Sequence, residues 1–284
     1  MTVETAVEFG KQTTLRGMLC QPPKANRRPV GVLILNAGLI HRAGPARMNT
    51  LMARRFAEQG FPVLRLDLSG LGFSLPRVKS EGMEQDNDGD VAEAIDYLQA
   101  SCGVESVVCI GLCSGAEISH RNALLQDRIT GAVFLDGYIF PTEKSRKIKL
   151  WNETVRHYAS RLFRISHWRR WFAARFGNRS GGEEASDTVI WEPTAMAHDQ
   201  FAQDLATLIG NGVQLKYIFA GTEMGCYYEE QMADSVPVAA SQACSVTHFP
   251  EADHIYLLES DRMAMIDCVE AWLVTHFEPA ASGQ

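Results

Sequence analysis

Continuously apolar runs of strand length recur along the chain and alternate with segments of helical periodicity. Runs that are apolar throughout are typical of strands buried on both faces of a sheet, whereas Val91, Ala94, Ile95 and Leu98 recur at helical spacing. The pattern predicts strands at 3–9, 12–20, 30–36, 61–67, 104–110, 129–135, 213–219 and 245–249, and helices at 48–59, 91–98, 115–126 and 258–276.

This alternation predicts an α/β fold with a mostly parallel, doubly wound sheet that begins with an antiparallel strand pair. The pattern breaks between residues 138 and 200, after the strand that ends at Asp136. We therefore expect a core of residues 1–137 and 201–284, with residues 138–200 inserted as a helical lid. Apolar residues at helical spacing within the insertion are Trp151, Val155, Tyr158 and Leu162.

Composition narrows the class of protein. The 284 residues, 46% of them hydrophobic, suffice for one large core. The amino terminus lacks a basic stretch followed by an apolar run, and no run approaches the ~20 apolar residues of a membrane span, so we expect a cytoplasmic protein. Seven cysteines, an odd number without a CxxC motif, indicate free thiols. The eight histidines do not cluster with them at ligand spacing, so we expect no metal and no cofactor.

Charge is distributed unevenly along the chain. Residues 138–179 carry eleven Lys and Arg against two acids, although the whole chain has a net charge of −7. Aromatic residues are interleaved with these arginines, and we select Trp168, Arg169 and Arg170 as candidate substrate-binding residues of the lid. A basic lid favours an anionic substrate or carrier. The alternatives are an anionic membrane surface and a solvated basic face, while nucleic acid is not expected without a recognised binding module.

The turn Gly111-Leu112-Cys113-Ser114-Gly115 joins a predicted strand directly to a predicted helix. The central residue of a Gly-x-Cys-x-Gly elbow lies in a sharp, strained turn, so its neighbours must lack side chains. A helix amino terminus also favours a thiolate over a thiol. We therefore expect Cys113 to be a nucleophile. The alternatives are Ser114 as the nucleophile and Cys113 as a buried, inert cysteine.

A nucleophile of this kind needs a base and an acid, in the chain order nucleophile, acid, histidine. His254 is the expected base because it follows the last predicted strand. The expected acid is Glu223, two residues after Gly221 at the end of the preceding strand, and Asp136 is the alternative acid.

Two backbone N–H groups should form an oxyanion hole for the tetrahedral intermediate. One belongs to Ser114, directly after the nucleophile. The other is expected in the loop that follows Asn36, with Leu39 as its donor.

Three segments of the sequence carry a family resemblance. The run from Phe61 to Ser74, the Gly111-Leu112-Cys113 elbow and Ala252-Asp253-His254 resemble the α/β-hydrolase superfamily. Within it, the cysteine elbow and the arginine-rich insertion resemble the exosortase A system-associated hydrolases, over most of the chain. The chain departs from the superfamily in three ways: cysteine replaces serine, glutamate replaces aspartate, and Asn36-Ala37-Gly38 stands where many relatives have His-Gly. Dienelactone hydrolases and polyhydroxyalkanoate synthases also have cysteine nucleophiles, so the replacement of serine does not imply an inactive enzyme.

The combined interpretation is an α/β-hydrolase-fold acyl hydrolase, an esterase or thioesterase, that acts through a cysteine acyl-enzyme. The alternative is an acyltransferase that passes the acyl group to an amine, hydroxyl or thiol, and a third possibility is a non-catalytic binding protein. The expected partner is a small-molecule or carrier-linked acyl substrate, with coenzyme A and acyl carrier protein as candidate carriers.

Overall fold

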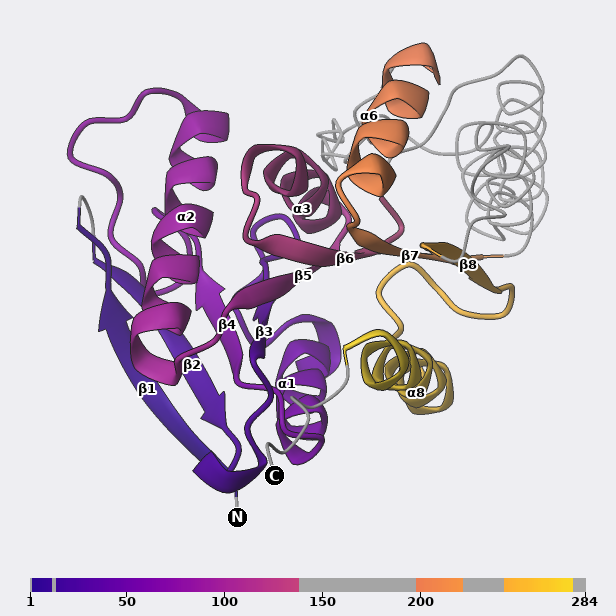
Figure 1. Cartoon of the computed structure of the whole chain (residues 1–284), viewed down its shortest axis with the longest axis horizontal. Helices are drawn as coiled ribbons and strands as arrows, with labels where there is room; N and C mark the ends of the chain where they lie inside the picture. The colour runs from indigo at the N-terminus through magenta and orange to yellow at the C-terminus, as the bar shows by residue number, and fades with distance from the viewer. Residues whose placement is uncertain (1, 12–13, 138–197, 222–242, 278–284) are drawn as a thin grey trace, which may run out of the picture. The chain divides into compact units, whose positions relative to one another are not determined.

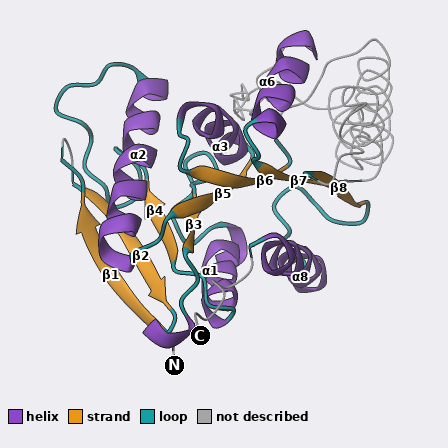
Figure 2. Cartoon of the chain, viewed as in Figure 1, coloured by secondary structure: helices purple, strands orange, loops and turns teal. Residues whose placement is uncertain are grey.

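The computed structural model describes residues 2–11, 14–137, 198–221 and 243–277. These residues form one eight-stranded sheet with helices on both faces (Figures 1 and 2). The strands are β1 (Val3–Phe9), β2 (Leu15–Gln21), β3 (Val30–Ile34), β4 (Val63–Asp67), β5 (Ser106–Leu112), β6 (Ile129–Leu135), β7 (Gln214–Ala220) and β8 (Cys244–Phe249). The helices are α1 (Met48–Glu58), α2 (Met83–Cys102), α3 (Ser114–Leu125), α6 (His198–Gly210) and α8 (Glu259–His276), with short 3-10 turns at Lys24–Asn26 and Pro45–Arg47.

The sheet confirms the predicted fold class. Its strand order is β1-β2-β4-β3-β5-β6-β7-β8, with β2 antiparallel to β1 and β4 and every other neighbouring pair parallel. The chain winds outward from β3 to β4 and then returns to β5 on the other side of β3. Ligands of open α/β sheets bind at such a switch point, beyond the carboxyl ends of the strands. The loops after β3 and β5 are therefore the first place to look for a site.

The continuous apolar character of the central strands has a direct cause, because successive side chains enter opposite core layers. In β3, Leu33 packs in the layer that includes residues of α2, α3 and α6. Val32 and Ile34 pack in the layer that includes residues of α1 and α8. Figure 1 shows the same division, with α2, α3 and α6 on one face of the sheet and α1 and α8 on the other.

Two helices differ from the sequence prediction. Helix α2 spans twenty residues, of which the apolar pattern predicted only 91–98. Its first half includes Asp90, a fully buried carboxylate that accepts hydrogen bonds from Arg77 at 2.6 Å and from the N–H of Ser69 at 2.6 Å. A charged residue on the buried face interrupts the apolar spacing that predicts a helix. The pattern also missed α6, and the remainder of the predicted lid, residues 138–197, lies outside the described residues.

Candidate active site

Cys113 lies in the turn between β5 and α3, at the carboxyl edge of the sheet. Its backbone has φ 61° and ψ −123°, a conformation that side-chain-bearing residues rarely adopt. A Cβ on Gly111 would lie 2.1 Å from the carbonyl group of Gly115, and a Cβ on Gly115 would lie 2.5 Å from the carbonyl oxygen of Asn36. Close backbone packing therefore accounts for both glycines of the elbow. Cys113 itself is half-buried.

His254, on the loop between β8 and α8, joins Cys113 to a carboxylate. Its Nδ1 lies 2.9 Å from Oδ2 of Asp136, and the ring also shares a hydrogen bond with the Cys113 side chain. The hydrogen bond to Asp136, reinforced by that to Cys113, raises the pKa of His254 to about 10 against the opposing effect of burial. The imidazole therefore carries a proton at neutral pH.

Asp136 follows β6, and backbone contacts orient its carboxylate. Its Oδ1 accepts a hydrogen bond from the N–H of Ala220 at 2.7 Å, and its own N–H donates to the carbonyl of Ile218 at 2.9 Å. Its φ of 45° is unusual for a residue other than glycine. The carboxylate that the structure brings to His254 is thus the alternative acid of the sequence analysis. Glu223, the expected acid, lies outside the described residues.

The turn that carries His254 is held by the residue before it. Asp253 accepts hydrogen bonds from the N–H of Ile255 at 2.9 Å and from the N–H of Leu257 at 3.0 Å. Arg262 of α8 donates to the carbonyl of Leu257 at 2.9 Å. The sequence analysis assigned no role to Asp253 or Arg262. An aspartate at the start of a turn often accepts hydrogen bonds from the backbone of that turn, so the role of Asp253 could have been recognised in the sequence. No local pattern predicts the hydrogen bond of Arg262.

The loop after β3 reaches the elbow through Gly38. The N–H of Gly38 donates a hydrogen bond to Oγ of Ser114 at 2.7 Å, and its φ of 53° suits a glycine. Leu39, which we expected to be the second oxyanion-hole donor, is 87% exposed. No hydrogen bond joins the Leu39 N–H to the elbow in the described part of the chain. The loop residue whose N–H points at the elbow is therefore one position earlier.

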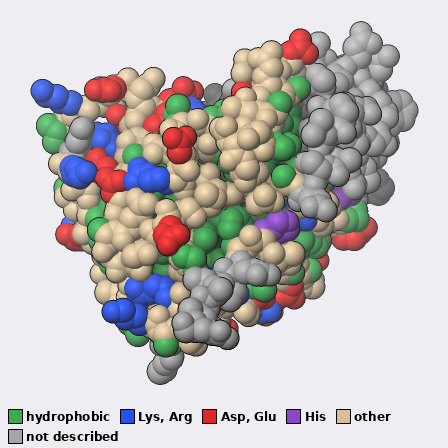
Figure 3. Space-filling model, in the orientation of Figure 1, with side chains coloured by type: hydrophobic (Ala, Val, Ile, Leu, Met, Phe, Trp, Pro, Cys, Tyr) green, Lys and Arg blue, Asp and Glu red, His purple; other side chains and the backbone are tan. Residues whose placement is uncertain are grey.

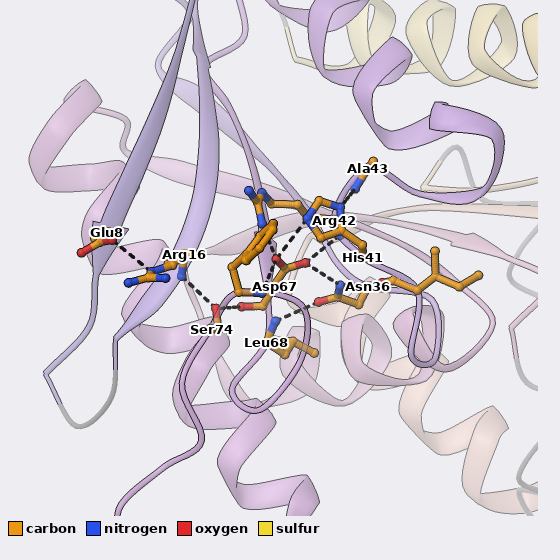
Figure 4. A network of polar contacts seen from close by, with 11 residues as sticks. Glu8, Arg16, Asn36, His41, Arg42, Ala43, Asp67, Leu68 and Ser74 are labelled. Carbon is orange, nitrogen blue, oxygen red and sulfur yellow. Dashed lines mark hydrogen bonds and ion pairs between the residues drawn. The ribbon is translucent and has the colours of Figure 1, made fainter.

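A buried carboxylate, Asp67 at the end of β4, anchors the same loop (Figure 4). Its Oδ1 accepts hydrogen bonds from the N–H of Arg42 at 2.6 Å and from Nδ2 of Asn36 at 3.3 Å. Its Oδ2 accepts from the N–H of Phe73 at 3.1 Å and pairs with the Arg42 guanidinium. Asn36 also accepts from the N–H of Leu68 at 2.8 Å. The sequence analysis assigned Asp67 no role, although a polar residue that ends an apolar strand before a glycine-rich loop is a usable signal.

Other predicted features are not placed by the structure. Trp168, Arg169 and Arg170 lie outside the described residues, so their contacts with substrate stay predictions. Among the residues that are described, no group of three or more His, Cys, Asp and Glu could hold a metal ion. The helices in those same ranges are all too short or too polar to cross a membrane.

Known proteins share the fold of this chain. The alpha/beta hydrolase fold family matches residues 31–207. A serine hydrolase without a lid from Xanthomonas campestris is 12% identical, with a TM-score of 0.56 over 98% of this chain and 97% of that one. An esterase of Pyrococcus furiosus is 13% identical, with a TM-score of 0.59 over 97% of this chain and 92% of that one. Dienelactone hydrolase of Anabaena variabilis is 13% identical, with a TM-score of 0.57 over 98% of this chain and 99% of that one. No curated protein matches the chain significantly.

Proposed function

The chain belongs to the alpha/beta hydrolase fold family, and from that premise we propose that it is an acyl hydrolase, an esterase or thioesterase, with a cysteine nucleophile. The observation that carries the proposal is the contact of one imidazole with both Cys113 and Asp136. A carboxylate that orients an imidazole, and an imidazole placed against a nucleophile, are the parts of a catalytic triad. The three residues follow one another in the chain order nucleophile, acid, histidine.

Each residue then has one role. The Cys113 sulfur attacks the acyl carbon, and the electron pair of the carbonyl bond moves onto its oxygen. Two backbone N–H groups, those of Ser114 and Gly38, stabilise the oxyanion. When the carbonyl re-forms, the bond to the leaving group breaks and protonated His254 supplies the proton. His254 then accepts a proton from water as that water attacks the thioester carbon. When this second intermediate collapses, the carbon–sulfur bond breaks, its electron pair returns to the Cys113 sulfur, and the acid is released.

We propose Asp136, rather than Glu223, as the acid of the triad. The support is its 2.9 Å contact with His254 Nδ1 and the backbone N–H that fixes its other carboxylate oxygen. Nδ1 is engaged by the carboxylate, which leaves Nε2 for the Cys113 sulfur. The acid stabilises the imidazolium and selects the orientation of the ring.

The final acceptor of the acyl group is water in this proposal. A cysteine acyl-enzyme is a thioester, so an amine, hydroxyl or thiol can attack it by the same chemistry. An acyltransferase would therefore need no different triad, and the products alone separate the two activities.

Intact-protein mass spectrometry tests the nucleophile. After incubation with a panel of acyl thioesters and esters, we expect a mass increase of one acyl group on the wild-type chain, followed by its loss as free acid. Cys113→Ala should show no adduct and a loss of turnover of at least about 10³-fold, because triad nucleophiles contribute that much or more. Ser114→Ala is the matched control and should still acylate. An adduct on Cys113→Ala that disappears in Ser114→Ala would move the nucleophile to the serine.

A further inference from the structure

We propose that the Ser114 hydroxyl occupies the oxyanion hole of the resting enzyme and must leave it before an acyl substrate is attacked. Ser114 would then set how readily the site accepts a carbonyl oxygen. This inference rests on the proposed function, because it assumes that Cys113 attacks a carbonyl carbon.

The hydrogen bond between the loop and the elbow carries the inference. The Gly38 N–H donates to Ser114 Oγ at 2.7 Å, a short and therefore well-formed contact. An N–H group has one hydrogen, so while Oγ holds it the same group is not available to an oxyanion. The second donor, the backbone N–H of Ser114, belongs to the first turn of α3 and has no acceptor within the helix. The Ser114 hydroxyl therefore engages one of the two N–H donors that the tetrahedral intermediate requires.

The side chain, rather than the loop, is the part that can move. Gly38 lies between Asn36 and Arg42, and both are tied to the buried Asp67 carboxylate. These hydrogen bonds hold the loop on both sides of Gly38, and breaking such bonds to a buried carboxylate is costly. Turning the half-buried Ser114 side chain requires one χ1 rotation and the loss of one exposed hydrogen bond.

During the attack, the Gly38 N–H changes from one hydrogen-bond acceptor, Ser114 Oγ, to another, the substrate oxygen. As the bond from sulfur to carbon forms, the substrate oxygen takes the electron pair of the carbonyl bond and accepts the Gly38 N–H that Oγ releases. The Ser114 hydroxyl keeps its proton throughout and turns toward solvent. When the intermediate collapses and the acyl group departs, the hydroxyl can return to the Gly38 N–H.

Two probes of Cys113 separate this role from a structural one. A trifluoromethyl ketone forms an anionic tetrahedral adduct with a thiolate, whereas iodoacetamide alkylates the sulfur without forming an oxyanion. In Ser114→Ala we expect the inhibition constant of the ketone to fall about two- to tenfold, the effect of one net hydrogen bond. The rate of alkylation of Cys113 by iodoacetamide, followed by peptide mass spectrometry, should be unchanged.

The matched control is Ser106→Ala at the other end of β5, where Ser106 Oγ accepts a hydrogen bond from Thr130 at 3.0 Å. This variant should leave both probes at their wild-type values. An unchanged inhibition constant in Ser114→Ala would show that the hydroxyl does not compete for the donor. A higher constant would show that it donates to the oxyanion. Either result overturns the proposal.

A structure of the wild-type ketone adduct gives a test that does not depend on any variant. We expect Ser114 Oγ to have left hydrogen-bond distance of the Gly38 nitrogen, and finding it still in place would overturn the inference. If neither probe modified Cys113 of the wild-type protein, the proposed function itself would fail. A failure confined to Ser114 would leave the triad intact.

Discussion

Two carboxylates compete for the role of triad acid, and single substitutions separate them. We expect Asp136→Asn to lower kcat/KM by about 10³- to 10⁴-fold, because the amide cannot stabilise the imidazolium or select its orientation. Glu223→Gln makes the same isosteric change at the other candidate and should alter kcat/KM by less than about threefold. Steady-state rates with one thioester measure both, and circular dichroism verifies folding. The opposite ranking would assign the acid to Glu223.

The raised pKa of His254 makes a prediction about stability and pH. The group titrates near 6.5 when unperturbed and at about 10 in the folded protein, chiefly because of its hydrogen bond to Asp136. The folded state therefore binds this proton more tightly than the unfolded state. The resulting stabilisation is complete below about pH 6.5 and is lost as the pH rises through about 10.

Urea unfolding of the wild type and of His254→Gln measures this contribution. Subtracting one free energy of unfolding from the other cancels groups that titrate equally in both proteins. We expect the wild type to exceed the variant by more at pH 6 than at pH 10. A difference that stayed constant or grew with pH would show that His254 is not held in its charged form.

At the scale of elements, Asp67 joins the loop after β3 to the loop after β4, and its removal should loosen both. Asp67→Asn replaces one carboxylate oxygen by an NH2 group, which donates hydrogen bonds and cannot accept them, and it leaves the Arg42 guanidinium without its buried charged partner. We expect a loss of about 3–5 kcal/mol in the free energy of unfolding.

The matched control for Asp67→Asn is Asp96→Asn. Asp96 forms ion pairs with Arg128 and Lys11, but its side chain is 43% exposed. Exposed pairs contribute little, so this variant should lose less than about 1 kcal/mol. Chemical unfolding monitored by fluorescence compares the two variants. Equal losses in the free energy of unfolding would mean that Asp67 stabilises the protein no more than an exposed ion pair does.

At the scale of the whole molecule, the uneven charge distribution is the feature that remains to be tested. On the face drawn in Figure 3, acidic and basic side chains of the described residues are interspersed. The excess of Lys and Arg is instead concentrated at residues 138–179, which carry eleven of them against two acids. Such a concentration favours capture of an anionic substrate.

Reversing the charge of Arg169 and Arg170 together to Glu tests that interpretation. We expect a lower kcat/KM for an acyl group linked to an anionic carrier such as coenzyme A, with the larger deficit at low salt, where charges are less screened. A short neutral ester is the control substrate and should be turned over at nearly the wild-type rate. Equal losses on both substrates would mean that the arginines stabilise the protein rather than capture a carrier.

Much of the fold follows from local patterns. The run at residues 129–135 is observed as β6 over the same residues, and the predicted helix at 258–276 is observed as α8 (Glu259–His276). Burial on both faces leaves a continuous apolar run, and one-sided burial leaves helical spacing, so both can be recognised within a few residues. The pattern failed for the first half of α2 because Asp90 is buried there with an ionic partner, Arg77, from the loop that directly precedes the helix.

The sequence by itself determined most strands of the sheet, the strained elbow at Cys113 and the position of His254 directly after the segment observed as β8. Each depends on residues that are neighbours in the chain, such as the two glycines that allow the turn. Only the tertiary structure showed that Asp136 meets His254, since the two residues are 118 positions apart in the chain. It also decided that Gly38 rather than Leu39 points at the elbow, and that Asp67 holds that loop. These contacts depend on the relative positions of β3, β4, β6 and β8, and those positions follow from packing of the whole sheet rather than from any local pattern.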